Sequence, residues 1–289
     1  MAVEQEPLVL VEPASTPIGV VVDSPHSGME WPEDFQPVAP GEAILTTWDA
    51  FVEDLWGGAP GAGATLLAAR FPRAYLDVNR AADDIDPELI EGAWPGPLRV
   101  SDYTRRGMGL IRRLALPGVP MYDRRLRPDE IQARLDRCYH PYRAALGDAI
   151  DRLHASFGAV VHINAHSMKS RGNAMNVDSG ALRPDVVVSD RHGTTADPVL
   201  TAWAAAWFRE HGFNAQVNTP SQGGDLIACF GTPASKRHSI QIELNRALYM
   251  DEARFVRAAG FAAIQRSLAA FVDALGVRMR VAGAGPTGA

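Results

Sequence analysis

The stretch that decides the fold is residues 128–166, PDEIQARLDRCYHPYRAALGDAIDRLHASFGAVVHINAH, in which a helical pattern is followed at once by a strand pattern. Apolar residues recur at helical spacing over residues 128–157, and Pro128 is typical of a first helical turn. Gly158 comes directly after the last periodic residue, where glycine commonly ends a helix. The β-branched run at 160–164 then predicts a buried strand. This segment therefore predicts an α/β protein.

The same patterns continue on both sides of this segment. They predict further strands at 18–22, 65–69, 74–78, 185–189 and 239–244. They also predict helices at 49–56, 200–211 and 252–275, with Asp251 as the N-cap of the last helix. Strands that alternate with helices indicate a three-layer α/β/α fold with a mixed, mostly parallel central sheet.

Length and composition are those of an ordinary globular protein. The 289 residues, 46% of them hydrophobic, predict a single domain over residues 1–280 and a flexible, Gly/Ala/Pro-rich tail over 281–289. Only two cysteines and two lysines occur, which excludes a multi-cysteine metal site, a disulfide framework and a lysine-containing phosphate loop. Any metal chemistry must therefore use the eight histidines and the carboxylates.

Charge and hydropathy argue against two classes of partner. The net charge is −6, whereas a protein that binds nucleic acid usually has a basic face. No apolar run approaches the roughly 20 residues needed to cross a bilayer, and residues 1–13 have no basic residue of the kind that opens a signal peptide. The sequence therefore predicts a cytoplasmic protein with no nucleic-acid or membrane partner, and it gives no indication of oligomeric state.

Polar side chains of catalytic types lie at the ends of four predicted strands. In chain order these residues are His26, Asn79, Arg80, His166 and Glu243. Ligands of open α/β sheets bind beyond the carboxyl ends of the strands, so we expect these side chains to converge on one face.

The two histidines predict a metal site. Two neutral imidazoles and one carboxylate leave an open position for water, as in a hydrolytic zinc site. Asp49 and Glu53 are four residues apart on a predicted helix, and either could supply the carboxylate. Glu243 could then act as the general base. The alternative for His26 and for His166 is a surface or hydrogen-bonded core histidine without a metal.

The arginines on either side of the strand predicted at 74–78 suit an anionic substrate. A guanidinium group binds a carboxylate through two hydrogen bonds, and Asn79 beside Arg80 adds a side-chain donor. Arg73 is a second candidate. The alternative for both arginines is a structural salt bridge to the acidic residues between 83 and 86. Gly223-Gly224 allows close backbone approach to a ligand or makes a tight turn, and the turn is the default.

An ordered set of motifs extends over most of the chain. These motifs are Pro25-His-Ser-Gly28, Asp49-Ala-Phe-Val-Glu53, Arg73-Ala-Tyr-Leu-Asp-Val-Asn-Arg80, Asn164-Ala-His-Ser-Met168, Gly223-Gly224 and Gln241-Ile-Glu-Leu-Asn-Arg246. In this order and spacing, between about residues 18 and 275, the chain resembles the N-formylglutamate amidohydrolase family.

The resemblance implies a fold of the phosphorylase/zinc-carboxypeptidase type, which aspartoacylases share. It also implies a role for each residue at the strand ends. His26 and His166 would be metal ligands and Glu243 the general base, while Asn79 and Arg80 would hold the carboxylate of the substrate.

The third metal ligand follows less directly from the resemblance. Carboxypeptidases place a glutamate three residues after the first histidine, where this chain has Met29. Asp49 is therefore the first choice and Glu53 the second, with Glu30 as a further possibility. Family members often carry aspartate at the position of Asn164, so the role of this residue next to the metal site would be altered here.

Together, the residues and the resemblance predict a zinc-dependent amidohydrolase that acts on a linear amide. The default substrate is N-formyl-L-glutamate, a small anion, which would yield formate and L-glutamate at the end of a histidine degradation route. The closest alternative is a metal-dependent deacylase or carboxypeptidase-like hydrolase that acts on another N-acyl amino acid or a small peptide. A third is a non-catalytic metal- or ligand-binding domain, which would not need His26, His166 and Glu243 together.

Residues 91–118 form either a lid over the site or a surface excursion.

Overall fold

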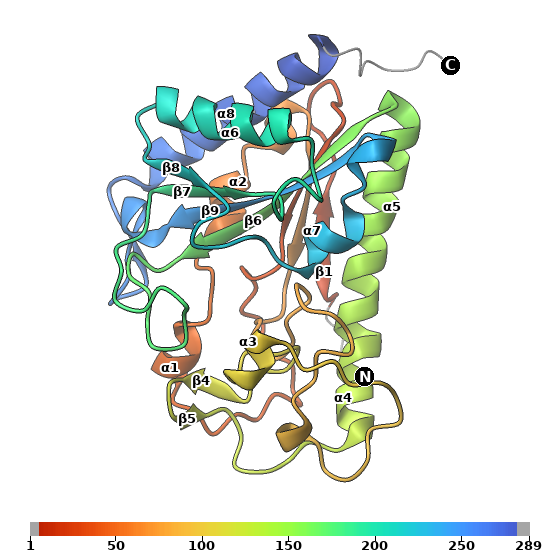
Figure 1. Ribbon diagram of the computed structural model, residues 1–289, viewed down its shortest axis with the longest axis vertical. Coiled ribbons are helices and arrows are strands. Elements are labelled where there is room, and N and C mark those ends of the chain that lie inside the picture. Colours follow the sequence, from red (N-terminus) through yellow and green to blue (C-terminus); the bar gives the residue numbers. More distant parts are fainter. Residues whose placement is uncertain (1–5, 282–289) are drawn as a thin grey trace. The chain divides into compact units, whose positions relative to one another are not determined.

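The chain forms two compact units, each assembled from segments that alternate along the sequence. Figure 1 shows the computed structural model, in which residues 6–281 are described. Unit 1 contains Pro25–Trp48 and Ala68–Ala145, with the N-terminal segment up to Val9. Unit 2 contains Leu10–Ser24, Asp49–Leu67 and the chain from Leu146 onward. The single domain expected over 1–280 stays a prediction, and the expected tail at 281–289 lies outside the described residues except for Val281.

The central sheet has seven strands in the order β1-β3-β2-β6-β9-β7-β8. They are β1 (Leu8–Val11), β2 (Val20–Ser24), β3 (Thr65–Ala69), β6 (Val160–Met168), β7 (Val186–Ser189), β8 (Ala215–Val217) and β9 (Arg237–Asn245). β2, β6 and β9 pair in parallel, β7 is antiparallel to β9, and β8 is parallel to β7. This confirms the predicted α/β class with a mixed, mostly parallel sheet.

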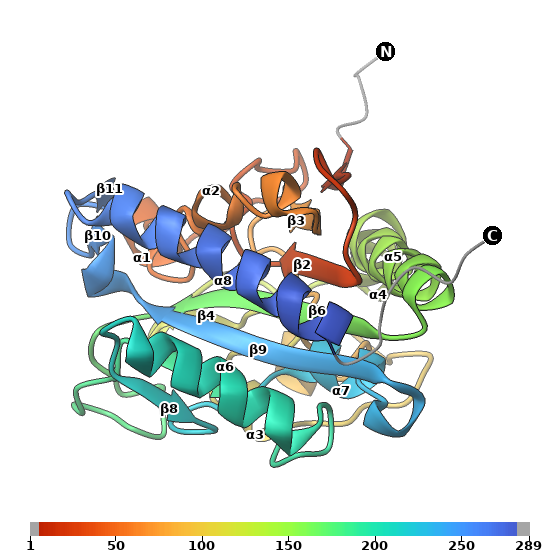
Figure 2. The same cartoon turned by 90° about the horizontal axis from the view of Figure 1, so that it is seen from above.

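Helices cover both faces of the sheet in unit 2, as Figure 2 shows from above. On one face lie α2 (Val52–Trp56), α6 (Pro198–Glu210) and α8 (Phe261–Val281). Phe271 of α8 joins these helices, because its ring lies 4.8 Å from that of Phe208 and 6.5 Å from that of Trp56. On the opposite face, Phe230 of α7 (Asp225–Phe230) lies 6.3 Å from the ring of His162. Within residues 6–281, no helix has both the length and the apolarity that a bilayer crossing requires.

Unit 1 consists mainly of turns and short elements around a buried arginine. Its elements are α1 (Gly41–Leu45), η2 (Pro87–Leu89), α3 (Asp102–Arg105), β4 (Leu114–Leu116), β5 (Val119–Pro120) and α4 (Pro128–Arg134). Arg134 is 1% exposed and donates to the carbonyl of Tyr75 (3.1 Å) and to the hydroxyl of Tyr122 (2.8 Å). Its guanidinium also lies 4.3 Å from the centre of the Tyr75 ring, so a cation–π contact and two hydrogen bonds offset part of the cost of its burial, although its Nε has no hydrogen-bond partner.

The long helix predicted at 128–157 is confirmed, with an irregular turn in its middle. α4 passes into a π-helical turn at Leu135–Tyr139 (η3) and then into α5 (His140–Phe157). Pro141 is the second residue after this turn, and its missing N–H cannot complete the regular ladder of hydrogen bonds. Gly158 has φ +69°, the left-handed conformation in which glycine ends a helix.

Residues 74–78 do not form the predicted strand. The amides of Tyr75 and Leu76 both donate to the carbonyl of Pro72, which makes this segment a buried turn. A short, fully buried apolar run has no periodicity that separates strand from turn. The predicted strand at 160–164 instead extends to Met168, so His166 lies inside β6 and not beyond its end.

The C-terminal helix begins later than predicted. Residues before Phe261 form turns and the short strands β10 (Met250–Asp251) and β11 (Val256–Arg257). Asp251 therefore does not cap α8; its carboxylate accepts from the amides of Ala253 and Arg254 and stabilises a turn. The remaining short elements of unit 2 are η1 (Pro60–Ala62), η4 (Pro233–Ser235) and η5 (Arg246–Leu248).

Candidate metal centre and active site

In unit 1, His26 is held by the buried carboxylate of Asp77. His26 lies in the turn that follows β2, and its Nε2 is 2.7 Å from Oδ1 of Asp77. Both side chains are almost fully buried, at 1% and 0% exposure. Burial would raise the pKa of Asp77, but the charges of Arg73, His26 and Arg80 outweigh burial and hold this pKa well below its usual range. Asp77 is therefore ionised at neutral pH and fixes the orientation of the His26 ring.

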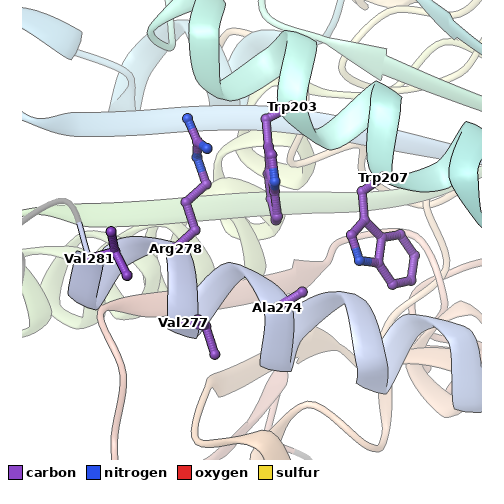
Figure 3. Close-up of a pocket in the computed structure, with 6 residues that line it drawn as sticks. All are labelled: Trp203, Trp207, Ala274, Val277, Arg278 and Val281. Atoms are coloured by element: carbon purple, nitrogen blue, oxygen red, sulfur yellow. The ribbon is translucent and has the colours of Figure 1, made fainter.

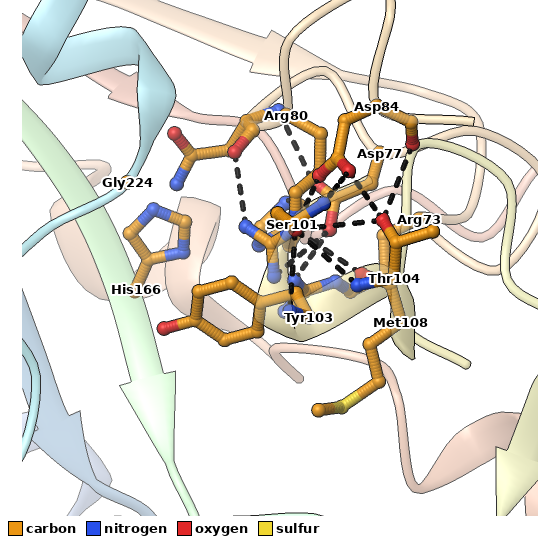
Figure 4. Close-up of polar contacts among 12 residues, drawn as sticks. Arg73, Asp77, Arg80, Asp84, Ser101, Tyr103, Thr104, Met108, His166 and Gly224 are labelled. Atoms are coloured by element: carbon orange, nitrogen blue, oxygen red, sulfur yellow. Dashed lines mark hydrogen bonds and ion pairs between the residues drawn. The ribbon is translucent and has the colours of Figure 1, made fainter. Parts of the chain in front are cut away.

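The predicted carboxylate-binding residues gather around the same aspartate (Figure 4). Nη2 of Arg73 is 2.6 Å from Oδ2 of Asp77, and Nη2 of Arg80 is 3.9 Å from it. The backbone amide of Asn79 donates to Oδ1 of Asp77 at 3.0 Å. Two guanidinium groups thus share one carboxylate, which leaves an excess of positive charge suited to an anion.

Arg80 is fixed on its other sides as well. Its Nε donates to the carbonyl of Met108 (3.2 Å), and its guanidinium carbon lies 4.1 Å from the centre of the Tyr103 ring. Tyr103 belongs to α3, whose N-cap Ser101 donates to Oδ2 of Asp84 at 2.7 Å. This part of residues 91–118 is therefore tied to the rest of unit 1, and its role as a lid or a surface excursion stays a prediction.

The acidic residues at 83–86 are not the partners of Arg73 and Arg80, contrary to the alternative considered from the sequence. Asp84 accepts from Ser101 and Thr104, and Asp86 accepts from Arg113 at 2.6 Å. Asp77, which lies between the two arginines in the sequence, takes that place because each is only three or four residues away.

In unit 2, Asp49 lies against His166. Oδ2 of Asp49 is 3.0 Å from Nδ1 of His166, and both residues are buried. Asp49 lies in a tight turn just before α2. The N-cap of α2 is Phe51, which has φ +62°, an unusual conformation for an aromatic residue. Arg246 donates to the other oxygen of Asp49 at 3.0 Å and to Ser167 at 3.1 Å. The carboxylate is thereby oriented from both sides.

Asn164 holds the far side of the His166 ring. Its side-chain oxygen is 2.7 Å from Nε2 of His166, while its side-chain nitrogen donates to Oδ1 of Asp23 at 2.8 Å. Asn164 and His166 are two residues apart on β6, so their side chains point to the same face of the sheet. The side-chain amide of Asn164 thus links the His166 ring to the carboxylate of Asp23.

The hydrogen bonds of the two histidines indicate which ring nitrogen carries a proton. Ionised Asp77 only accepts, so His26 donates from Nε2, and His166 likewise donates from Nε2 to Asn164. Nδ1 of His166 and Oδ2 of Asp49 lie 3.0 Å apart, a contact that a proton on Nδ1 or a cation between the two atoms would stabilise. His26, Asp49 and His166 are all buried, and their two imidazoles and one carboxylate could hold a metal ion.

Glu243 lies on the strand next to His166. It is partly exposed on β9 and accepts from Nε2 of Gln241 at 3.0 Å. The side-chain oxygen of Gln241 accepts in turn from the amide of Gly224 at 2.8 Å. Gly223 has φ +102°, and a Cβ there would lie 2.2 Å from a side-chain atom of Ile227, so glycine is required for the turn itself. Binding of substrate at Gly223 and Gly224 stays a prediction.

The sequence did not assign roles to three residues that hold the site. Asp77, Asp23 and Arg246 each bind a predicted ligand or its neighbour, yet Arg246 is 197 residues from its partner Asp49. The only signal for Asp77 and Arg246 was their place inside the ordered motifs. Of the two candidate carboxylates, Asp49 lies 3.0 Å from His166, and the choice between Asp49 and Glu53 as metal ligand stays a prediction.

A groove on the outer surface of unit 2 lies between α6 and α8 and has a volume of about 600 Å³ (Figure 3). Its lining consists of Trp203, Trp207, Ala274, Val277, Arg278 and Val281. These side chains offer no metal ligand and no nucleophile, so the residues that could carry chemistry lie elsewhere.

Known proteins of one family match this chain over most of its length. The profile of the N-formylglutamate amidohydrolase family matches residues 18–250. The N-formylglutamate deformylase of Pseudomonas putida is 28% identical over 237 residues, which cover 81% of this chain and 82% of that protein. The N-formylglutamate deformylase of Pseudomonas aeruginosa PAO1 is also 28% identical, over 239 residues that cover 81% and 83%.

A solved structure agrees with these sequence matches. The crystal structure of N-formylglutamate amidohydrolase from Ralstonia eutropha JMP134 is 42% identical and superposes with a TM-score of 0.91. The match covers 96% of this chain and 100% of that one. The chain described here therefore belongs to the N-formylglutamate amidohydrolase family.

Proposed function

We propose that this chain hydrolyses the N-formyl amide of N-formyl-L-glutamate to formate and L-glutamate, with Zn²⁺ or another divalent metal as cofactor. The observation that carries the proposal is the buried group of His26, Asp49 and His166, whose possible ligand atoms all lie within 4.8 Å of one another. The names of the similar deformylases support the choice of substrate. Formate and L-glutamate would be the products of the last step of a histidine degradation route, and we expect the enzyme to act in the cytoplasm.

The proposed metal ligands are His26, Asp49 and His166. A bound metal would polarise the formyl carbonyl and lower the pKa of a water ligand to about 7. Arg246 holds the outer oxygen of Asp49 at 3.0 Å, so the inner oxygen keeps its direction. Glu53, the alternative carboxylate, lies one helical turn further along the chain and is not needed to complete this set.

Glu243 acts as general base and then as general acid. It removes a proton from the attacking water, and it returns this proton to the amine of glutamate as the C–N bond breaks. Gln241 donates to Oε1 of Glu243 and so orients the carboxylate that would take the proton. The direct neighbour of Glu243 on the next strand is the proposed ligand His166.

Arg80 and Asn79 bind a carboxylate of the substrate. Arg80 is held by Met108 and by the ring of Tyr103, so little side-chain entropy is lost when an anion binds. Arg73 adds positive charge next to the same site through Asp77, and either Arg73 or Arg80 would stabilise the developing oxyanion.

Metal content and formate release test this function. Purified protein would be analysed for bound metal and then assayed for formate or acetate release from a panel of N-formyl and N-acetyl amino acids, before and after chelation. We expect N-formyl-L-glutamate to be the best substrate and chelation to abolish turnover. Bound metal without release from any panel member would instead favour a non-catalytic binding protein, and a better N-acetyl substrate would favour another deacylase.

A further inference from the structure

A chain of buried hydrogen bonds runs through unit 2 from β9 to His166. Ser239 lies 3.1 Å from Nδ1 of His162, and Nε2 of His162 lies 2.7 Å from Oδ1 of Asp23. The same oxygen accepts from Asn164 at 2.8 Å, and Asn164 lies 2.7 Å from Nε2 of His166. Every member of this chain is at most 3% exposed. Asp23 and His162 have no part in the chemistry described above.

The order of donors along this chain is determined by Asp23. A carboxylate oxygen can only accept, so His162 and Asn164 must both direct N–H groups toward it. Because the amide of Asn164 has its nitrogen on the Asp23 side, its oxygen must face His166. That oxygen accepts the Nε2 proton of His166, so that in the neutral imidazole, the form that binds a metal, Nδ1 carries no proton.

An asparagine without such an anchor would not select a tautomer. A rotation of 180° about the last side-chain bond exchanges the amide oxygen and nitrogen, and both can bind an imidazole. With its nitrogen toward His166, Asn164 would favour a proton on Nδ1, the atom proposed to bind the metal. A metal ligand usually has its other ring nitrogen fixed by an outer partner, and here that partner is itself reversible.

We propose that Asp23, supported by His162, is a positioning residue for the metal site. It fixes the amide of Asn164, and through this amide it keeps His166 in the tautomer that presents Nδ1 beside Asp49. The inference rests on the proposed metal site, but it concerns residues that do not touch the metal.

The test compares Asp23→Val with the double variant Asp23→Val/Asn164→Asp. In the single variant, Asn164 loses its anchor and can turn its nitrogen toward His166. In the double variant, position 164 carries a carboxylate that can only accept, so the Nε2 proton of His166 is restored without Asp23. A merely structural role for Asp23 would not be rescued by this second change.

Two measurements apply to every variant. The Zn²⁺ affinity is measured by competition with a chromophoric chelator, and the His166 tautomer is read from two-bond ¹H–¹⁵N correlations in histidine-labelled protein. We expect Asp23→Val to weaken Zn²⁺ binding roughly 10- to 100-fold, the usual cost of losing an outer partner, and the double variant to recover most of this loss. The control is Asp190→Val, because Asp190 pairs with Asn218 at the same 2.8 Å and is also buried. This control should lose stability and keep its Zn²⁺ affinity.

The outcomes separate the two proposals. If the wild type binds Zn²⁺ and Asp23→Val binds it equally well, or if the double variant recovers nothing, the positioning role is wrong. If Asp23→Val does not fold, Asn164→Leu is tested in its place. We expect Asn164→Leu to bind Zn²⁺ more weakly than the wild type. An unchanged Zn²⁺ affinity would show that the positioning role is wrong. If the wild type binds no Zn²⁺, the proposed function fails, while an Nε2 proton on His166 that depends on Asp23 would still support the positioning.

Discussion

Glu243 on β9 is the direct neighbour of His166 on β6, because the two strands pair in parallel with these residues as register partners. Side chains of such partners point to the same face of a sheet. The proposed base and a proposed metal ligand are therefore positioned by backbone pairing and not by a flexible loop. Rigid elements of this kind hold catalytic groups within the small tolerances that proton transfer requires.

This pairing predicts the effect of Glu243→Gln. The variant keeps the shape of the side chain but cannot accept the water proton, so kcat should fall by about 10²–10⁴-fold, the usual contribution of general acid–base catalysis. The KM and the metal content should stay near their wild-type values. Steady-state formate release and metal analysis provide the measurements, with the exposed Glu210→Gln on α6 as control. A near-normal kcat would show that another group is the base.

Asp49→Asn and Glu53→Gln distinguish the two candidate carboxylate ligands. Asp49→Asn places an amide beside His166 and removes a charge that Arg246 neutralises. It should weaken metal binding by more than the roughly 10- to 100-fold that outer partners contribute. Glu53→Gln should leave the metal affinity unchanged, as measured by chelator competition. The reverse ranking would exchange the roles of these two residues.

The lowered pKa of Asp77 predicts a specific dependence of stability on pH. A carboxyl group whose pKa is depressed by folding stabilises the folded state above its unfolded pKa of about 3.9, and this stabilisation is lost as pH falls toward the folded pKa. Asp77→Asn removes the partner of buried Arg73 and should cost about 3–5 kcal/mol at neutral pH.

The check is urea denaturation of the wild type and of Asp77→Asn at a series of pH values from 7 to below 4. The difference in unfolding free energy between wild type and Asp77→Asn should be constant down to about pH 5 and should shrink below pH 4. Asp129→Asn is a matched control, since Asp129 also pairs with an arginine, Arg127, but on the surface. A difference that stays constant to low pH would contradict the ionised state of Asp77.

Arg80→Lys tests the carboxylate clamp. Lysine keeps the charge but loses the two parallel N–H groups and the flat contact with Tyr103. We expect kcat/KM for N-formyl-L-glutamate to fall roughly 10- to 100-fold, which corresponds to one lost hydrogen bond to a charged group. The loss should appear mainly in KM. Arg99→Lys, at a largely exposed position, is the control, and an unchanged KM in Arg80→Lys would place the clamp elsewhere.

Periodic patterns were sufficient to predict the strands that carry the site. The strand at 65–69 was predicted with its observed bounds, and β6 and β9 lie within a few residues of theirs, because alternation and β-branching are local properties. The segment 74–78 failed because Pro72 organises it through backbone hydrogen bonds that no side-chain pattern records. Helix α8 was predicted nine residues too early, since its preceding turns are also partly apolar.

The candidate site could be predicted only in its inner part. Histidine and glutamate residues at the ends of predicted strands can be recognised in the sequence. The order of the motifs that resemble the family then identified His26, His166 and Glu243 among them. Their outer partners are not visible, because Asp77 is 51 residues from His26 and Asp23 is 141 residues from Asn164. Tertiary packing brings these residues together, and no spacing rule for a helix or a strand relates them.

Gly28 closes the first motif, and its place in the structure explains why that motif ends in glycine. A Cβ at this position would lie 2.3 Å from the backbone carbon of Arg70 and 2.4 Å from the carbonyl oxygen of Ala69. Backbone atoms cannot move aside as a flexible side chain can, and the amide of Glu30 is bound to the Arg70 carbonyl at 2.8 Å. The chain directly after His26 is thus held against residues 69–70.

Gly28→Ala should therefore disturb His26 without touching it. We expect the free energy of unfolding to fall by about 1–3 kcal/mol, as for overpacking of a well-packed region, and the Zn²⁺ affinity to fall with it because the ring of His26 is displaced from Asp77. Gly41→Ala is the control, since a Cβ there meets nothing within 4 Å and alanine favours the helix that begins at this residue. Urea denaturation and chelator competition measure both quantities. Loss of stability with an unchanged Zn²⁺ affinity would mean that the turn holds the fold but does not position the first histidine.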